Sequence, residues 1–162
     1  VVSKYDDDVF QLSQLDFTKK VKYPLDQCKS DTYEFYDFCP RIFHLIRKIV
    51  EITSLVYLQS IGPEQLFGSI SMGHLISLQS HCSAGKSGSL FYYTNDQKFM
   101  LKTISHNEFT HFLSIMQNYY SHMLAFPHSL VARILGLHKI KFTRDGRIHR
   151  IYFVIMANVF NT

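Results

Sequence analysis

Residues 90–103 read LFYYTNDQKFMLKT, two apolar runs on either side of a short polar segment. Aromatic residues such as those at 91–93 favour β-strands. The polar residues 94–97 are typical of a four-residue hairpin loop, in which Asp96 is an ordinary turn former. The stretch therefore predicts a β-hairpin over residues 88–103, with Lys102 near the end of the returning strand.

Beyond this hairpin, the sequence predicts a helix and then a second hairpin. Ser105 and Glu108 have capping-box spacing. They precede an apolar stripe of helical period, formed by Phe109, Phe112, Leu113, Met116 and Tyr120. Pro127 ends this helical region, and residues 131–142 and 148–156 flank an Asp-Gly pair that indicates a tight turn.

Towards the N-terminus, Pro40 stands where a helix can begin, and Ile42, Ile46 and Ile49 recur at helical spacing. Helical segments are expected as far as residue 67. Residues 1–35 show no sustained period, and we expect them to form an arm or an edge strand. The order of elements predicts an α+β fold, an antiparallel β-sheet with flanking helices, over residues 36–162.

Composition restricts the class of protein. The chain has 162 residues, and its 46% hydrophobic content is sufficient for the core of one globular domain. Three cysteines without paired spacing and nine histidines without a metal-binding motif predict no structural metal. A net charge of +4 is only a mild bias towards anionic partners, and no nucleic-acid partner is expected. The absence of a long apolar run and the acidic residues 6–8 favour a cytoplasmic location.

The loop before the first hairpin, residues 83–89, reads SAGKSGS. A P-loop would need glycine where Ser80 stands and a helix after the loop, so we reject that motif. Gly85 and Gly88 let backbone N–H groups approach phosphates, although a flexible surface loop has the same composition. With Lys102 on the returning strand beneath it, the loop and the lysine are placed to hold one triphosphate.

Several segments in the right order resemble the phosphatidylinositol phosphate kinase family: residues 83–92, 99–103, 135–138 and 152–160, with Cys39-Pro40-Arg41-Ile42-Phe43 upstream. The resemblance covers about residues 36–161. It implies the N-terminal, ATP-binding lobe of that fold, ending at the interlobe hinge, with the C-terminal catalytic lobe absent. It also implies a lipid kinase that uses ATP and Mg²⁺ to phosphorylate the inositol ring of a phosphoinositide. Phosphatidylinositol 4-phosphate 5-kinases are the most similar, while residues 132–136 also resemble the 3-phosphate 5-kinases.

The resemblance assigns roles to residues. Lys102 is the phosphate-binding lysine, and Gly85, Lys86, Ser87, Gly88 and Ser89 form the lid, whereas Met156, Asn158 and Val159 line the adenine site. The magnesium ligands and catalytic carboxylate belong to the missing lobe, so no catalytic residue is expected in the chain, which should be inactive alone. Glu108 is the one carboxylate available to pair with Lys102, but capping is its favoured role.

A basic group on the second hairpin comprises Lys139, Lys141, Arg144, Arg147 and Arg150. It is either a solvated sheet edge or a contact for anionic lipid headgroups, which would give peripheral association with the cytosolic membrane face. The resemblance is also compatible with a homodimer through this lobe. The alternative function is a noncatalytic module, such as a pseudokinase-like scaffold or a basic membrane-docking domain.

Overall fold

The centre of the fold is a six-stranded sheet, seen in a computed structural model that describes residues 12–25, 33–61, 89–94, 96–144 and 146–158. The strand order is β1-β2-β5-β6-β4-β3, and every neighbouring pair is antiparallel. The strands are β1 (Lys20–Leu25), β2 (Tyr33–Phe38), β3 (Phe91–Tyr93), β4 (Phe99–Ile104), β5 (Ile134–Arg144) and β6 (Arg147–Ala157). The predicted α+β fold and both predicted hairpins are confirmed.

Helices flank this sheet on both faces. They are α2 (Pro40–Ile49), α3 (Ser54–Ile61), α6 (His106–Ser114) and α7 (Met116–Ala125), with a 3-10 turn, η1, at Gln14–Phe17. Phe109 of α6 packs on Tyr152, whereas Tyr57 of α3 packs on Phe99, which lies on the opposite face of the sheet by register. Among these described helices, none is long and apolar enough to cross a bilayer.

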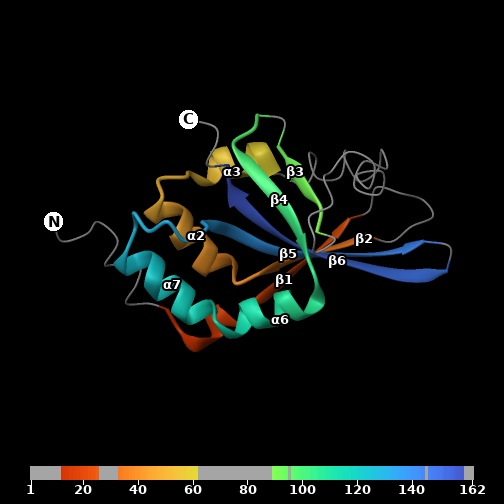
Figure 1. The fold of residues 1–162 in the computed structure, drawn as a ribbon. Coiled ribbons are helices and arrows are strands. Elements are labelled where there is room, and N and C mark those ends of the chain that lie inside the picture. The colour runs from red at the N-terminus through yellow and green to blue at the C-terminus, as the bar shows by residue number, and fades with distance from the viewer. Residues whose placement is uncertain (1–11, 26–32, 62–88, 95, 145, 159–162) are drawn as a thin grey trace.

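The single helix predicted after the first hairpin is two helices. Ile115 separates them, with φ −100° and ψ 4°, outside the helical region. Packing explains the bend, because α6 contacts β6 whereas α7 packs against α2 (Figure 1). A local apolar period cannot reveal such a bend, since each half keeps the same periodicity.

The N-terminal region contributes more to the sheet than its sequence suggests. Residues Lys20–Leu25 form an edge strand, one of the two forms predicted for this region. β2 lies between β1 and β5, so the predicted boundary at residues 35 and 36 falls inside a strand. The β5–β6 hairpin is the longest pair in the sheet, and its far end extends beyond the rest of the described fold (Figure 1).

A β-bulge marks the start of β5. The register with β6 shifts between Ile134 and Gly136, which leaves Leu135 as the extra residue. β2 pairs with β5 only as far as Leu137. Next to the bulge, the neighbour of β5 on that side is the helix α2 instead of a strand. There the guanidinium of Arg47 donates from Nη1 to the Leu135 carbonyl at 2.6 Å. A side chain thus supplies the hydrogen bond that a neighbouring strand would otherwise make.

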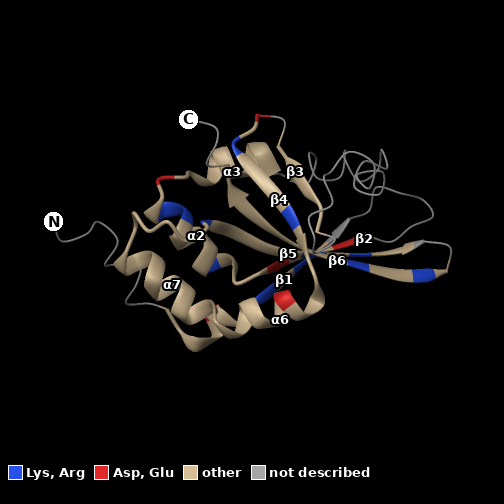
Figure 2. Cartoon of the chain, viewed as in Figure 1, with Lys and Arg blue, Asp and Glu red and all other residues tan. Residues whose placement is uncertain are grey.

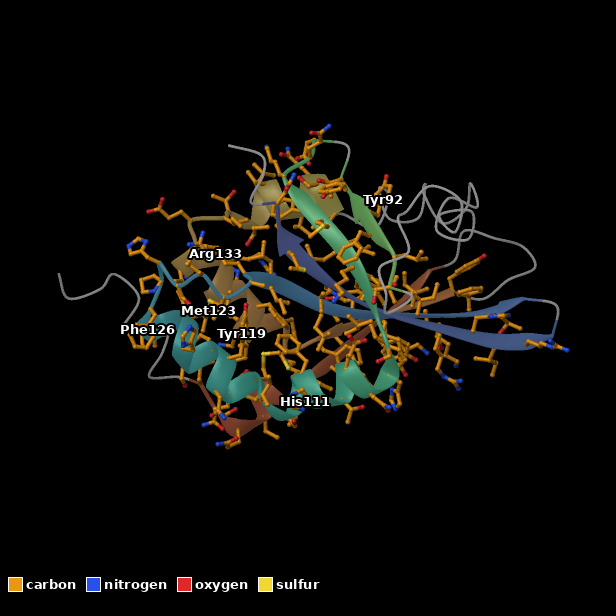
Figure 3. All side chains as sticks on the ribbon, in the orientation of Figure 1. Tyr92, His111, Tyr119, Met123, Phe126 and Arg133 are labelled. Carbon is orange, nitrogen blue, oxygen red and sulfur yellow. The ribbon has the colours of Figure 1, made fainter. Side chains whose placement is uncertain are left out.

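Buried side chains line both faces of the sheet, and α2 and α7 pack against each other over one end of it. Tyr119 of α7 lies over the start of β5, where its hydroxyl accepts from the Ile134 N–H at 2.7 Å and donates to the Ala132 carbonyl at 2.9 Å (Figure 3). The largest fully buried side chains are Ile42, Phe43, Ile46, Met116, Met123, Leu135, Leu137, Ile140, Phe153 and Ile155. This packing holds the central strands β5 and β6 rigidly, and they position the site described next.

Candidate nucleotide-binding face

One face of the sheet carries the predicted phosphate and adenine residues together. In the strand register, Lys102 of β4 lies opposite Phe91 of β3 and opposite Val154 of β6. Met100 lies opposite Met156 in the same way, two residues along. Because cross-strand partners and alternate residues share a face, these side chains lie on one surface, which we call the Lys102 face.

Lys102 itself is half-buried in apolar surroundings. Its Nζ lies 5.7 Å from the centroid of the Phe91 ring, and Val154 beside it is only 4% exposed. An ammonium held beside apolar side chains is attracted more strongly to an anion than one in open water. The geometry therefore suits an anionic group such as a phosphate.

Glu108 performs the capping role that its spacing predicts. Its Oε2 accepts from the Ser105 N–H at 2.7 Å, and the Ser105 hydroxyl accepts from the Glu108 N–H at 3.2 Å. Hydrogen bonds to its carboxylate, first from the Ser105 N–H and then from the Ser105 side chain, hold the pKa of Glu108 below its ordinary value, with a smaller contribution from the charge of Lys102. Within the described part of the chain, the ion pairs do not include one between Lys102 and Glu108.

Ser89 and Leu90 lie beside the strand that carries Lys102. Ser89 is 5% exposed, and Leu90 extends the hairpin by accepting from the Thr103 N–H at 2.9 Å and donating to the Thr103 hydroxyl at 2.8 Å. The rest of the predicted lid, Gly85, Lys86, Ser87 and Gly88, lies outside the described residues. Of the predicted lid residues, the structure describes Ser89, two residues before Phe91, the register partner of Lys102.

The predicted adenine residues divide between two locations. Met156 is half-buried on the Lys102 face. Asn158 follows β6 and is bound to the β3–β4 turn: its N–H donates to the Lys98 carbonyl at 2.9 Å, and its side-chain amide donates to the Gln97 carbonyl at 2.6 Å. Val159 lies outside the described residues. Contact of Asn158 with adenine stays a prediction.

The basic residues of the second hairpin lie on two faces of the sheet. By register, Lys139, Lys141 and Arg150 lie on the Lys102 face, because Lys141 is opposite Arg150 and Lys139 is opposite Tyr152. Arg147 is opposite Arg144 at the turn, and register puts Arg147 on the other face. Figure 2 shows the blue segments spread along β5 and β6 rather than gathered in one block.

Two lysines that sequence reasoning missed, Lys20 and Lys22, join this basic group from β1. Tyr36 of β2 lies between these two lysines and Lys139. The Nζ of Lys139 is 3.8 Å from the centroid of the Tyr36 ring. Burial, followed by the charge of Lys20, lowers the pKa of Lys139. The alternation of lysines at positions 20 and 22 was the available sign of a one-faced strand.

Glu34 partly neutralises this basic surface. Its carboxylate pairs with Lys22, lies 3.0 Å from Lys141 Nζ and accepts from the Tyr36 hydroxyl at 2.8 Å. The hydrogen bond from Lys22, followed by those from Lys141 and Tyr36, lowers the pKa of Glu34 to about 2. The surface is therefore less cationic than a count of lysines implies.

A buried polar network on the opposite face was also missed by sequence reasoning. The Tyr57 hydroxyl lies 3.2 Å from His138 Nε2, between residues 81 apart in the chain. His138 Nδ1 lies 3.2 Å from an Asp37 carboxylate oxygen, without hydrogen-bond geometry. The Arg47 guanidinium stacks on the Tyr57 ring at 4.1 Å. The network joins α2, α3, β2 and β5.

The described residues provide no set of magnesium ligands. Among them, no group of three or more His, Cys, Asp or Glu side chains lies close enough to hold a metal ion. Around Lys102, the face places an ammonium against the apolar side chains of Phe91 and Val154, which suits phosphate and base binding rather than metal coordination.

Comparison with known proteins gives the class of this chain. Its residues 73–162 match the family model described as phosphatidylinositol-4-phosphate 5-kinase. It is 39% identical over 130 residues to a phosphatidylinositol 4-phosphate 5-kinase of Plasmodium falciparum (isolate 3D7). The aligned region covers 79% of this chain and 8% of that protein. It is 30% identical over 158 residues to phosphatidylinositol 4-phosphate 5-kinase its3 of Schizosaccharomyces pombe, covering 93% and 19% respectively.

These matches are to phosphoinositide kinases, as the sequence resemblance predicted. The chain belongs to the phosphatidylinositol 4-phosphate 5-kinase family. It spans between 8% and 19% of the length of the two relatives described above.

Proposed function

We propose that this chain is the ATP-binding lobe of a lipid kinase that transfers the γ-phosphate of ATP to the inositol ring of a phosphatidylinositol phosphate. The observation that carries the proposal is the Lys102 face, where a half-buried ammonium lies beside Met100 and Met156. The names of the two relatives favour phosphatidylinositol 4-phosphate as the substrate and the 4,5-bisphosphate as the product.

Each part of the face has a physical task in this proposal. The Lys102 ammonium stabilises the negative charge of the α- and β-phosphates, and the lid, residues 85–89, covers them with backbone N–H groups. Met100 and Met156 supply an apolar wall against the base. Mg²⁺ would supply further charge neutralisation at the triphosphate, through ligands that we expect in a C-terminal lobe. A face that contacts one side of a nucleotide binds it weakly, and the 162 residues alone should be inactive.

The substitution Lys102→Met tests the proposal, because methionine keeps the apolar stem and removes the charge. A fluorescent ATP analogue is titrated into the 162-residue chain with Mg²⁺, and turnover of phosphatidylinositol 4-phosphate is measured in the whole protein. We expect loss of turnover and at least tenfold weaker binding, about 1.4 kcal/mol or more. Lys48→Met on the exposed side of α2 is the matched control and should change neither. Equal binding and turnover in Lys102→Met and the parent would contradict the proposal.

We also propose that the basic surface formed by Lys20, Lys22, Lys139, Lys141 and Arg150 contacts anionic lipid headgroups. Its support is that these cations come from β1, β5 and β6 yet lie on one face by register. Such a surface would attract a negatively charged membrane and weaken with salt. A homodimer through this lobe stays a prediction.

Vesicle co-sedimentation tests this surface. Replacing Lys139, Lys141 and Arg150 with glutamate should abolish binding to vesicles containing phosphatidylinositol 4-phosphate, whereas Lys48→Glu should leave it intact. Unchanged vesicle binding would exclude the surface as a membrane contact. Vesicle binding by a parent chain that binds no nucleotide would favour the noncatalytic membrane-docking module.

A further inference from the structure

The β3–β4 turn is organised by one carboxylate. Asp96 Oδ1 accepts from the Thr94 hydroxyl at 2.6 Å and from the Lys98 N–H at 3.2 Å. Thr94 is buried, and its hydroxyl also accepts from the Phe99 N–H at 3.1 Å. The carboxylate therefore fixes both sides of the turn, which is more than the ordinary turn-forming role that its sequence position suggests.

The same carboxylate joins the turn to α3. Asp96 Oδ2 lies 2.6 Å from the Ser60 hydroxyl, and Lys98 Nζ lies 3.8 Å away. Burial raises the pKa of Asp96, but hydrogen bonds from Ser60, Thr94 and the Lys98 N–H more than offset it, so the pKa lies below its ordinary value. The group is therefore ionised at neutral pH, and hydrogen bonds to a charged acceptor are stronger than those to a neutral one.

The β3–β4 turn also binds the residue that follows β6, Asn158. Gln97 adopts φ 56°, a left-handed conformation that is costly for a residue with a side chain. In that conformation its carbonyl accepts from the Asn158 side-chain amide, and the next carbonyl, that of Lys98, accepts from the Asn158 N–H. Two successive carbonyls therefore hold Asn158, two residues after Met156.

We propose that Asp96 is a positioning residue for nucleotide binding, which acts by fixing the two carbonyls that hold Asn158 at the end of the Lys102 face. The inference rests on the proposed function, because it needs the nucleotide to lie against Met156 and Lys102. A displacement of about 1 Å at such a site can reduce its effectiveness greatly, even when the altered residue touches no ligand. Through Ser60, the same carboxylate makes the position of α3 part of the site's geometry.

The test separates positioning from stability. Asp96→Ala removes every bond of the carboxylate, whereas Asp96→Asn keeps an acceptor for Thr94 and Lys98 N–H. We expect KM for ATP to rise about three- to tenfold in Asp96→Ala with kcat within about twofold, and a smaller rise in Asp96→Asn. ATP-analogue binding by the 162-residue chain should weaken in the same order. If Asp96→Ala does not fold, the same comparison is made with Asp96→Asn and Ser60→Ala, because each of these variants keeps some of the hydrogen bonds of the Asp96 carboxylate.

Asp16→Ala is the matched control, because it removes a buried carboxylate that accepts from Ser13 in η1, which packs on α2, and should lower stability without contacting the turn. The inference would be overturned if KM for ATP changed in none of the Asp96 variants. It would also be overturned if KM for ATP rose in the control as much as in an Asp96 variant of equal stability. A parent chain that binds no ATP analogue would instead contradict the proposed function, so the two failures are distinguishable.

Discussion

Gly136 lies in the β5 bulge, where it faces the buried pair of Tyr57 and His138. A Cβ added at this position would lie 2.3 Å from the Tyr57 hydroxyl oxygen and 2.5 Å from His138 Nε2. Both distances are far below van der Waals contact, so both rings, or the strand that carries Gly136, must shift. Tyr57 is held by Arg47 at 4.1 Å on its face and by Phe99, whose ring centroid is 5.7 Å away. Gly136→Ala therefore forces a change in a packed region.

The cost can be worked from its parts. Overpacking a filled core costs about 1–3 kcal/mol. Separating the Tyr57 hydroxyl from His138 leaves buried polar groups unsatisfied, at about 1–3 kcal/mol more. The reduced freedom of the unfolded chain returns roughly 0.4–1 kcal/mol. We expect a net loss of about 1–5.5 kcal/mol, which in a domain of this size lowers Tm by roughly 2–20 °C.

Urea unfolding followed by circular dichroism measures this loss, and a double-mutant cycle with Tyr57→Phe identifies its cause. Tyr57→Phe removes the nearest obstructing atom, so Gly136→Ala should cost about 1–2 kcal/mol less in that background. Gly146→Ala is the control: it has open space and φ 69°, and its cost of about 1–2 kcal/mol comes from backbone strain and should not depend on Tyr57. Equal losses for Gly136→Ala in both backgrounds would refute the steric explanation.

Three further measurements follow from the structure. The depressed pKa of Glu34, about 2 against 4.5 unfolded, contributes stability that is complete above about pH 4.5 and is lost as the pH falls towards 2. Glu34→Gln should reduce this part of the acid dependence of Tm. Burial raises the pKa of the Cys39 thiol to about 12, so Cys39 should resist alkylation at pH 8 until the chain unfolds, as read by peptide mass spectrometry. Tyr119→Phe should lower the free energy of unfolding by about 1–2 kcal/mol, because the Ile134 N–H loses its acceptor.

Features that depend on neighbouring residues could be predicted from the sequence. The Ser105 and Glu108 capping box needs only four consecutive residues, and both of its hydrogen bonds form. The hairpin containing Lys102 likewise depends on two short runs and the turn between them. The family resemblance rested on the order of such segments, and it was confirmed.

Features that depend on distant residues were not predictable. The break at Ile115 follows from how α6 and α7 pack on different partners, which a helical period does not record. The basic residues looked like one group on a hairpin, but strand register separates Arg147 from Lys141. The pairing of Tyr57 with His138 joins elements 81 residues apart and leaves no local pattern in the sequence.

Arg47 shows which exchanges this lobe would tolerate in redesign. Its planar guanidinium serves two neighbours at once, since it stacks on the Tyr57 ring and donates to the Leu135 carbonyl. A lysine would carry the same charge on a rounded head that lacks the flat fork, so it would lose either the ring or the carbonyl. A chimera that transplants β5 with its bulge into a related scaffold should therefore carry Arg47 and Tyr57 with it as one module.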